Sequence, residues 1–391
     1  MEMTGRMGLE TAVHRARRET AVATKMIVTH NTTRYLELHY GELLKSLVQR
    51  GITVVVVAPL DEHARWLEES GIRCVDVSLS QHGMNPAGEL RSLLALGWIL
   101  LREKPDTLFN FSIKPVIYGS LVARVLRLPK VYSMITGLGY VFIEGGVPKG
   151  LLRRFVVALY RLSLRDNRTV FFQNEHDKEL FERHRIVSEE RTCVLPGTGI
   201  DTSGYSPGEP RNGDLRFVMA TRLIVEKGVR EYVEAARALR KASGRVEFLL
   251  AGPIEGSPSA IGIEEIRSWQ AEGVIEYVGS LEDIRPLLHG ADVLVLPSYY
   301  REGLPRSLVE AMACGLAVIT TDWPGCRDCV EDGINGILVP PRDPRALEDA
   351  MRRLIEKPDL ARTMGKRGRA TAVERYSVDK VNGQIMQHLL A

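Results

Sequence analysis

The sequence that decides the fold is Arg301-Glu302-Gly303-Leu304-Pro305-Arg306-Ser307-Leu308-Val309-Glu310. Pro305 suits the first position of a helix. The N–H of a residue there has no hydrogen-bond partner within the helix, so proline, which has no N–H, loses nothing. The helix is predicted to run to about Cys314 and to end at Gly315, a residue type that commonly terminates helices. An apolar strand over residues 316–321 follows.

The start of this predicted helix is expected to bind an anion, because N–H groups and a partial positive charge gather at a helix N-terminus. The backbone around Gly303 and Leu304 is therefore predicted to face a diphosphate. Glu302 and Glu310 are eight residues apart, at most roughly 12 Å along a helix. They are expected to face polar groups on either side of the phosphates, such as a sugar and a ribose. The alternative is a helix with a solvated glutamate at each end.

The length and composition indicate an ordinary globular chain of two domains. It has 391 residues, a hydrophobic fraction of 45% and a formal net charge of +3. The length suits two domains of usual size, and the small net charge gives no indication of nucleic-acid binding. The sequence has no apolar run long enough to predict a membrane-spanning helix.

The five cysteines are scattered and odd in number, which predicts reduced thiols in a cytosolic enzyme. Cys326 and Cys329 have the spacing of a metal or redox pair. A zinc site needs four ligands, and no second Cys/His pair accompanies them, so we expect incidental thiols. Residues 1–25 lack the apolar core of a signal peptide. They are predicted to form a frayed or helical leader, with a basic membrane-surface arm as the alternative.

Strands and helices alternate through both halves of the chain, which predicts parallel sheets with helices on both faces. Strands are predicted at 26–29, 53–58, 73–77, 107–111, 131–135, 169–174, 216–220, 246–251, 275–278, 293–297, 316–321 and 335–339. Helices are predicted at 36–50, 63–71, 90–103, 147–164, 229–241, 305–314, 346–355 and 378–390. The Gly/Pro/Ser-rich segment 203–213 is the predicted linker. It separates domains at residues 26–205 and 206–375, and a helix within 376–391 is expected to pack back on the first domain.

Polar residues follow several of these strands, where open parallel sheets bind ligands. Arg222 and Lys227 follow the first strand of the second domain. They suit a diphosphate leaving group, whose developing charge needs preorganised positive groups; the alternative is a loop with two solvated cations. In the first domain, Asn110, Lys114 and the pair Thr136-Gly137 occupy such positions, although ordinary loop chemistry explains them equally well. Lys114 would meet either an acceptor phosphate or the donor.

The segment from residue 147 to 165 combines arginines with apolar residues in a basic amphipathic helix. Two interpretations remain open. It is either a buried helix with a solvated rim or a helix that rests on anionic lipid headgroups.

The 301–310 stretch resembles the Glu-x7-Glu motif of family-four glycosyltransferases of the GT-B fold. Segments at 110–115, 136–140, 194–201 and 221–228 match that family in the same order. The match is strongest in residues 215–340. The resemblance implies an α/β protein with two Rossmann-like, doubly wound domains facing an interdomain cleft.

The resemblance also implies roles for individual residues. Arg222 and Lys227 would bind the donor phosphates, Glu302 would contact the transferred sugar near C1, and Glu310 would accept hydrogen bonds from the ribose. Glu302, Arg222 and Lys227 form the predicted catalytic set. The predicted donor-binding residues are Gly303, Leu304, Glu310, Gly252, Pro253, Leu281 and Arg306. The predicted acceptor-binding residues are Asn110, Lys114, Thr136 and Gly137.

The implied reaction transfers a hexose or N-acetylhexosamine from a nucleotide sugar, UDP-linked by expectation, with retention of configuration. The leaving phosphate oxygen would take the acceptor proton, so no protein base is required. No metal or other cofactor is expected, and the chain contains no Asp-x-Asp. The expected acceptor is a polyprenyl-diphosphate-linked glycan of surface polysaccharide synthesis, met in the cytoplasm or at the inner face of the membrane.

The sequence departs from the family's pattern at two places. The loop His30-Asn31-Thr32-Thr33-Arg34 replaces a glycine-rich loop, and Thr136 stands where many members have a catalytic histidine. Three other functions are alternatives to glycosyl transfer: a sugar-nucleotide epimerase, a non-catalytic sugar-nucleotide-binding protein and an NAD-dependent dehydrogenase. The dehydrogenase is disfavoured because no Gly-x-Gly-x-x-Gly follows the first strand.

Overall fold

The structure is a computed structural model that describes residues 24–79, 86–138, 149–209, 213–242, 246–254, 256 and 258–391. The predicted leader at residues 1–25 therefore lies almost wholly outside the described residues. By compactness the chain divides into two units, Met1–Tyr132 and Ser133–Ala391. The predicted domain boundary near residue 205 falls inside the second unit and stays a prediction.

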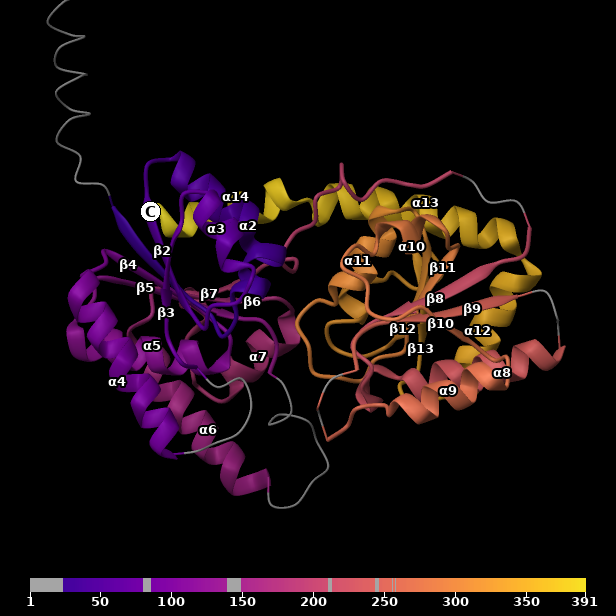
Figure 1. Cartoon of the computed structure of the whole chain (residues 1–391), viewed down its shortest axis with the longest axis horizontal. Helices are drawn as coiled ribbons and strands as arrows, with labels where there is room; N and C mark the ends of the chain where they lie inside the picture. The colour runs from indigo at the N-terminus through magenta and orange to yellow at the C-terminus, as the bar shows by residue number, and fades with distance from the viewer. Residues whose placement is uncertain are drawn as a thin grey trace, which may run out of the picture. The chain divides into compact units, whose positions relative to one another are not determined.

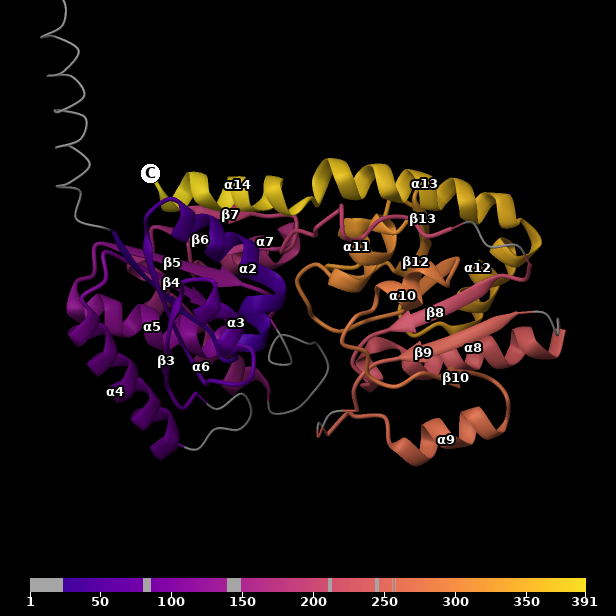
Figure 2. The same ribbon diagram turned by 45° about the horizontal axis from the view of Figure 1, so that its top comes forward.

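The first sheet has seven strands in the order β3-β2-β1-β4-β5-β6-β7. Its strands are β1 (Lys25–Thr29), β2 (Thr53–Ala58), β3 (Arg73–Asp76), β4 (Thr107–Phe111), β5 (Lys130–Ile135), β6 (Thr169–Phe172) and β7 (Thr192–Val194). The helices between them are α2 (Thr33–Gln49), α3 (Ala64–Glu69), α4 (Pro86–Glu103), α5 (Ile113–Leu126), α6 (Lys149–Ser163) and α7 (Glu175–Arg183). Within the first unit, α2 and α3 cover one face of β1 to β4, and α4 and α5 cover the other (Figures 1 and 2).

The second sheet has six strands in the order β10-β9-β8-β11-β12-β13. Its strands are β8 (Arg216–Ala220), β9 (Glu247–Ala251), β10 (Glu276–Tyr277), β11 (Val293–Leu296), β12 (Ala317–Thr321) and β13 (Gly336–Val339). Its helices are α8 (Val229–Ala242), α9 (Ile263–Ala271), α10 (Arg285–His289), α11 (Arg306–Ala313), α12 (Pro344–Glu356) and α13 (Pro358–Arg375). Helices α8 and α12 pack together, and α11 packs with α13 (Figure 1).

Both sheets follow the doubly wound pattern that the sequence predicted. The described strand pairs are parallel, and the order reverses beside the first strand of each sheet. The strands are apolar and buried, as in the run Val54–Ala58, because helices cover both faces of such a sheet. Ligands of this architecture bind where the strand order reverses, which is between β1 and β4 and between β8 and β11.

Helices α5 and α13 were not predicted from the sequence. Helix α13 contains Gly365 and Gly368, which weaken the helical signal. A Cβ atom at Gly365 would lie 2.0 Å from the carbonyl oxygen of Gly315, so glycine there permits close packing of α13 on the turn after α11. The glycines that tertiary packing requires therefore weaken the helical pattern in the sequence of α13.

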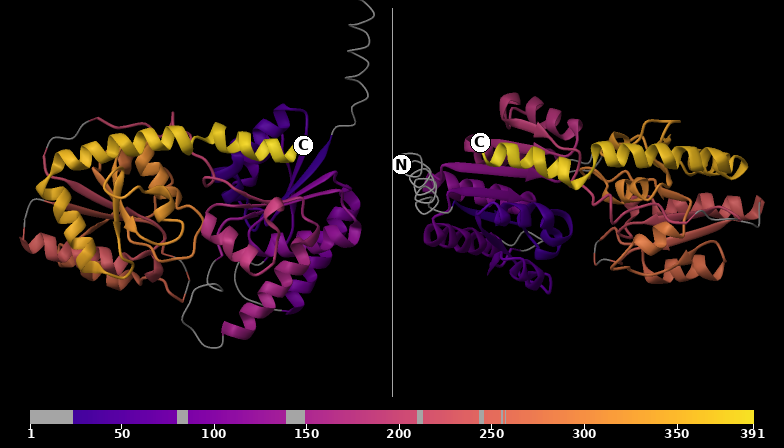
Figure 3. Two further views of the ribbon diagram at one scale, coloured as in Figure 1. Left: turned by 180° about the vertical axis from the view of Figure 1, so that it is seen from behind. Right: turned by 90° about the horizontal axis from the view of Figure 1, so that it is seen from above.

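The final helix, α14 (Val378–Leu389), follows directly on α13 and is drawn in yellow in Figure 3. Its His388 stacks edge-on against Phe171, with ring centroids 5.3 Å apart, and contacts Thr169. Both partners belong to β6, a strand that the domain prediction assigns to the first domain. The segment that leads into the second sheet pairs with the segment that leads into α14. Ile200 N donates to Tyr376 O at 2.8 Å, and Val378 N donates to Ile200 O at 2.9 Å.

Candidate active site

The candidate site lies where the strand order of the second sheet reverses. The loop after β8 carries Arg222 and Lys227, and the loop after β11 carries Ser298, Tyr300 and Glu302. Strands β8 and β11 pair in parallel, so their carboxyl ends meet at the same edge of the sheet. The fold therefore brings the predicted cations and the predicted glutamate to one place.

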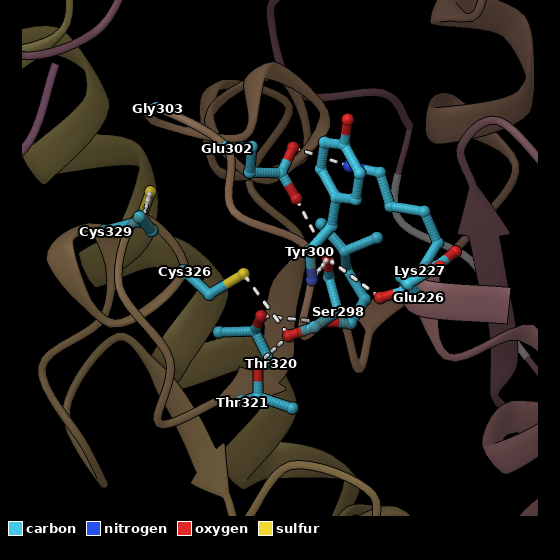
Figure 4. Close-up of polar contacts among 12 residues, drawn as sticks. Glu226, Lys227, Ser298, Tyr300, Glu302, Gly303, Thr320, Thr321, Cys326 and Cys329 are labelled. Carbon is cyan, nitrogen blue, oxygen red and sulfur yellow. Dashed lines mark hydrogen bonds and ion pairs between the residues drawn. The ribbon is translucent and has the colours of Figure 1, made fainter. Parts of the chain in front are cut away.

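Lys227 and Glu302 form a close ion pair at the centre of this site (Figure 4). Lys227 Nζ donates to Glu302 Oε2 at 2.5 Å, and the two side chains are only 7% and 17% exposed. Ser298 Oγ donates to the other carboxylate oxygen, Oε1, at 2.9 Å. Both oxygens of Glu302 are thus held by protein donors, whereas an ammonium group has two further N–H donors for a ligand.

The two predicted phosphate-binding cations both lie over the ring of Tyr300. Arg222 Cζ lies 5.4 Å and Lys227 Nζ lies 5.7 Å from its centroid. These distances are within the range of cation–π attraction. The ring thereby contributes to holding both positive groups beside Glu302.

Backbone contacts join the loop after β8 to the loop after β11. Tyr299 N donates to Glu226 O at 2.9 Å. Gly228 ends the short helix η4 (Val225–Lys227) with φ of 78°, and a Cβ there would lie 2.3 Å from Pro297 O. A side chain at Gly228 would separate the loops, so this glycine sets the position of Lys227.

The Glu302–Gly303 peptide contacts residues that directly follow β5 and β6. Gly303 N donates to Thr136 O at 3.2 Å, and a Cβ at Gly137 would lie 3.0 Å from the Glu302 Cα. Asn174 Nδ2 lies 3.4 Å from the carbonyl oxygens of both Glu302 and Gly303. The predicted acceptor residues Thr136 and Gly137 are therefore in direct contact with the motif that carries the predicted catalytic glutamate.

Helix α11 begins one residue later than predicted, because Pro305 is its N-cap residue and Arg306 its first helical residue. Glu310 is buried and accepts from Arg306 Nε at 2.8 Å and from the Tyr205 hydroxyl at 3.1 Å. Arg306 also reaches the Thr198 hydroxyl at 3.3 Å. Arg306 thus links Glu310 to the segment that leads into the second sheet. Leu304 lies beside that segment too, 2.9 Å from a Cβ built on Gly197.

The other predicted donor-binding residues border the same loops. Gly252 N donates to Gly279 O at 2.8 Å, and Leu223 N donates to Pro253 O at 3.1 Å. Leu281, just beyond this turn, is 39% exposed. The loops after β8, β9 and β10 are thereby held together, although Glu255 lies outside the described residues.

The two predicted acceptor residues of the first unit have partners of their own. Asn110 is fully buried and accepts from the Thr29 hydroxyl at 2.7 Å. A direct contact with an acceptor would require this side chain to be uncovered. Lys114 is half-buried and pairs with Glu89 at 2.6 Å.

The predictions missed Ser298, Tyr300 and Asn174. Ser298 and Tyr300 follow β11 at its carboxyl end, and the rule that located Arg222 and Lys227 would have indicated them. Asn174 caps α7 by accepting from Asp177 N at 2.8 Å, so the sequence signal was that of an ordinary helix start.

The cysteine pair is buried beside this site. Burial, and then the nearby Glu302 charge, raise the pKa of Cys326 to about 12, which keeps the thiol protonated and unreactive. Among the described residues, no group of three or more His, Cys, Asp or Glu side chains is arranged to hold a metal ion. Likewise, none of the helices in the described part of the chain combines the length and apolar character needed to cross a bilayer.

The chain is similar to known glycosyltransferases in sequence and in fold. Residues 37–198 match a family described as glycosyl transferase 4-like domain, and residues 214–357 match glycosyl transferases group 1. The chain is 28% identical over 345 residues to N,N'-diacetylbacillosaminyl-diphospho-undecaprenol alpha-1,3-N-acetylgalactosaminyltransferase of Campylobacter jejuni, covering 85% of this chain and 89% of that protein. It is 29% identical to alpha-D-kanosaminyltransferase of Streptomyces kanamyceticus over 58% of this chain and 61% of that protein.

Among solved structures, Anabaena Alr3699/HepE in complex with UDP-glucose superposes with a TM-score of 0.77 at 20% identity, covering 93% of this chain and 99% of that chain. Sucrose-phosphate synthase of Thermosynechococcus elongatus gives 0.75 at 19% identity, covering 93% of this chain and 98% of that chain. These likenesses support the GT-B fold, and the two family matches together span most of the sequence. The chain therefore belongs to the glycosyltransferases that join a 4-like domain to a group 1 domain.

Proposed function

We propose that the protein transfers a hexose or N-acetylhexosamine from a UDP-sugar to a polyprenyl-diphosphate-linked glycan, with retention of anomeric configuration. The observation that carries this proposal is the placement of Lys227 and Arg222 around Tyr300, beside Glu302 and the loop that leads into α11. Two cations and the N–H groups at the start of a helix form a suitable site for a diphosphate.

Glu302 acts in this scheme as an electrostatic stabiliser rather than as a nucleophile. Its two carboxylate oxygens accept hydrogen bonds from Ser298 and Lys227, which lowers their electron density and fixes their orientation. A fixed carboxylate near C1 stabilises the positive charge that develops on the sugar ring as the bond to phosphate breaks. The departing phosphate oxygen takes the acceptor proton, so the reaction needs no protein base. Arg222, Lys227 and the helix N-terminus neutralise the diphosphate in place of a divalent metal.

Glu310 is the proposed partner of the ribose hydroxyls. It now accepts from Arg306 and Tyr205, and a carboxylate has lone pairs for further donors. Leu281, Gly252 and Pro253 would border the base and the diphosphate. Residues 26–205 and 206–375 would form the acceptor and donor domains.

The choice of donor and acceptor draws on the relatives. The name of the Campylobacter relative specifies an acceptor carried on diphospho-undecaprenol, and Anabaena HepE was solved with UDP-glucose. A lipid-linked acceptor diphosphate would compete with Glu89 for Lys114 and would approach Thr136 and Gly137. Helix α6, which exposes Phe155 and Leu162, would contact the inner membrane surface within residues 147–165.

The proposal is tested by the effect of ligands on thermal unfolding, because a ligand bound only by the native state raises its melting temperature. UDP-sugars should raise the melting temperature and NAD should leave it unchanged. The double variant Arg222→Ala/Lys227→Ala should lose the shift. The matched control, Arg267→Ala/Lys241→Ala, removes two exposed cations from elsewhere and should keep it.

A transfer assay then separates the alternatives. Incubation of the enzyme, a UDP-sugar and a lipid-diphosphate glycan should yield an elongated glycan with the anomeric configuration of the donor. Conversion of the donor to an isomeric sugar nucleotide without acceptor would indicate an epimerase. A binding protein would show a melting-temperature shift with UDP-sugars but no sugar transfer by the wild type. Its Glu302→Gln variant would bind the UDP-sugar as tightly as the wild type does.

A further inference from the structure

Helix α4 carries a row of large apolar side chains on its solvent side. Leu90, Leu94, Trp98 and Leu101 are 56%, 65%, 61% and 57% exposed. Their spacing places them on one face of the helix, over about 16 Å of its length. We call these four residues the α4 stripe. The opposite face carries Leu96, Ile99 and Leu100, which are buried, so the helix is apolar on both sides.

The neighbouring helix α5 also exposes a large apolar side chain. The two helices pack closely, since a Cβ at Gly97 would lie 3.8 Å from Val122 Cγ1, and Val125 on α5 is 80% exposed. Single exposed apolar residues are normal on a protein surface. A contiguous row of this size instead indicates a contact surface.

The charges around the stripe are positive. Arg91 and Arg102 are exposed between and beside its members, and the Arg102 guanidinium lies 5.3 Å from the Trp98 ring centroid. The two acidic residues of α4 are neutralised elsewhere: Glu89 pairs with Lys114, and Glu103 pairs with Lys25 and Arg73. Lys104 and Arg127, at the ends of α4 and α5, are exposed as well.

We propose that the α4 stripe lies in the surface of an anionic lipid bilayer, with the helix parallel to the membrane. Leucines and a tryptophan on one face, flanked by arginines, are typical of helices that insert their apolar side at the headgroup boundary. The amphipathic Trp98 ring suits that depth, and the flanking arginines suit anionic headgroups. A second copy of the chain is a poorer partner, because a two-fold contact would bring the same positive rims together.

This surface consists of other residues than the lipid contact proposed for residues 147–165, and it does not depend on the identity of the acceptor. The test is co-sedimentation of the full-length protein with phosphatidylcholine vesicles that contain or lack phosphatidylglycerol. The wild type should bind the anionic vesicles. The double variant Leu94→Ser/Trp98→Ser should lose at least about tenfold in partitioning, because both side chains leave water on binding. Arg91→Gln/Arg102→Gln should lose about tenfold, and salt should weaken wild-type binding.

Control variants keep the test specific. Val373→Ser on α13 and Ile263→Ser on α9 also remove exposed apolar side chains and should bind as the wild type does. Trp98 provides a readout on the otherwise unchanged protein: its fluorescence should shift to the blue with anionic vesicles, and Trp98→Phe should abolish the shift.

Three results would overturn the proposal. One is undiminished partitioning of Leu94→Ser/Trp98→Ser. Another is loss of binding only in Phe155→Ser/Leu162→Ser, which would leave α6 as the sole lipid contact. The third is a change of oligomeric state in the Leu94→Ser/Trp98→Ser variant, which would show that a second copy covers the stripe. Sugar transfer to a water-soluble acceptor should be unchanged in the stripe variants, so a failure here is distinct from a failure of the proposed function.

Discussion

At the residue scale, the function proposed for Glu302 depends on side chains that hold its carboxylate in place. Ser298 Oγ donates to Oε1 and Lys227 Nζ donates to Oε2. Hydrogen bonds to a charged group contribute about 1.5–3 kcal/mol, and this pair is shielded from water. The orientation of the carboxylate is therefore sensitive to changes at positions that never touch the substrate.

Ser298→Ala should lower kcat by roughly tenfold or more, a change that matches the loss of one hydrogen bond to a carboxylate. KM for the donor should change little, because Ser298 is fully buried and the cations remain. Steady-state kinetics at varied donor concentration would measure kcat and KM separately. Ser298→Cys, which retains a weak donor, should restore part of the activity. An equal loss of kcat in the exposed control Ser268→Ala would contradict this role.

Asp177 gives a pH dependence to stability. Burial raises its pKa from 3.8 to about 6, although the Asn174 amide and the Arg301 guanidinium act in the opposite direction. The folded protein thus holds this proton more tightly than the unfolded chain does. Protonated Asp177 therefore adds to the free energy of unfolding below about pH 4. This contribution is lost as the pH rises through 6, which lowers the free energy of unfolding by up to about 3 kcal/mol.

The measurement compares denaturant unfolding of the wild type and Asp177→Asn at several pH values. The wild type should lose stability relative to the variant between pH 4 and pH 6. The difference between the two proteins should be constant above that range. A constant difference over the whole range would mean that Asp177 titrates near its ordinary value.

How much of the site the sequence could predict depends on the kind of signal. Arg222, Lys227 and Glu302 were predicted because each follows a strand or belongs to a recognisable motif, and the fold brings them together. The pairing of Lys227 with Glu302, and the burial of Asn110, depend on contacts between segments far apart in the chain. No local pattern encodes such contacts, so they became visible only in the folded structure.

At the element scale, the long helix α13 shows how packing overrides helix propensity. Glycine is unfavourable within a helix by about 1 kcal/mol relative to alanine, yet Gly365 allows α13 to approach the Gly315 carbonyl. No helix was predicted over residues 358–375, the segment that contains these glycines. In contrast, α8 and α12 have strongly one-sided apolar patterns, and both were predicted to within a few residues.

Two helical glycines provide a matched experiment. Gly365→Ala should destabilise the protein by about 1–3 kcal/mol, because the new methyl group would meet the Gly315 carbonyl at 2.0 Å. Gly383→Ala on α14 should stabilise it by up to about 1 kcal/mol, since nothing lies within 4 Å of the added Cβ. Denaturant unfolding of both variants checks the signs. Stabilisation by both substitutions would show that α13 does not pack as described.

At the scale of the whole molecule, the two compact units should respond differently to a donor nucleotide. The cations, Glu302 and Glu310 all belong to Ser133–Ala391. A ligand at a hundred times its Kd stabilises the unit that binds it by about 2.7 kcal/mol. UDP should therefore raise the unfolding temperature of the second unit more than that of the first.

The four tryptophans allow this difference to be measured. Trp66 and Trp98 lie in the first unit, and Trp269 and Trp323 lie in the second. Tryptophan fluorescence comes from the second unit alone in the variant Trp66→Phe/Trp98→Phe. It comes from the first unit alone in the variant Trp269→Phe/Trp323→Phe. Thermal melts with and without UDP should shift mainly in the former variant. Equal shifts in both would indicate that the units unfold as one.

The paired segments at Ile200 and Ser377 have a further consequence. There the outgoing and the returning chain run side by side as a miniature two-stranded ribbon, and α14 seats the far end of the polypeptide on β6. After a protease cut just beyond Glu209, the two fragments should therefore remain associated through these non-covalent contacts. The protein is consequently a natural candidate for splitting into two separately expressed halves that reassemble.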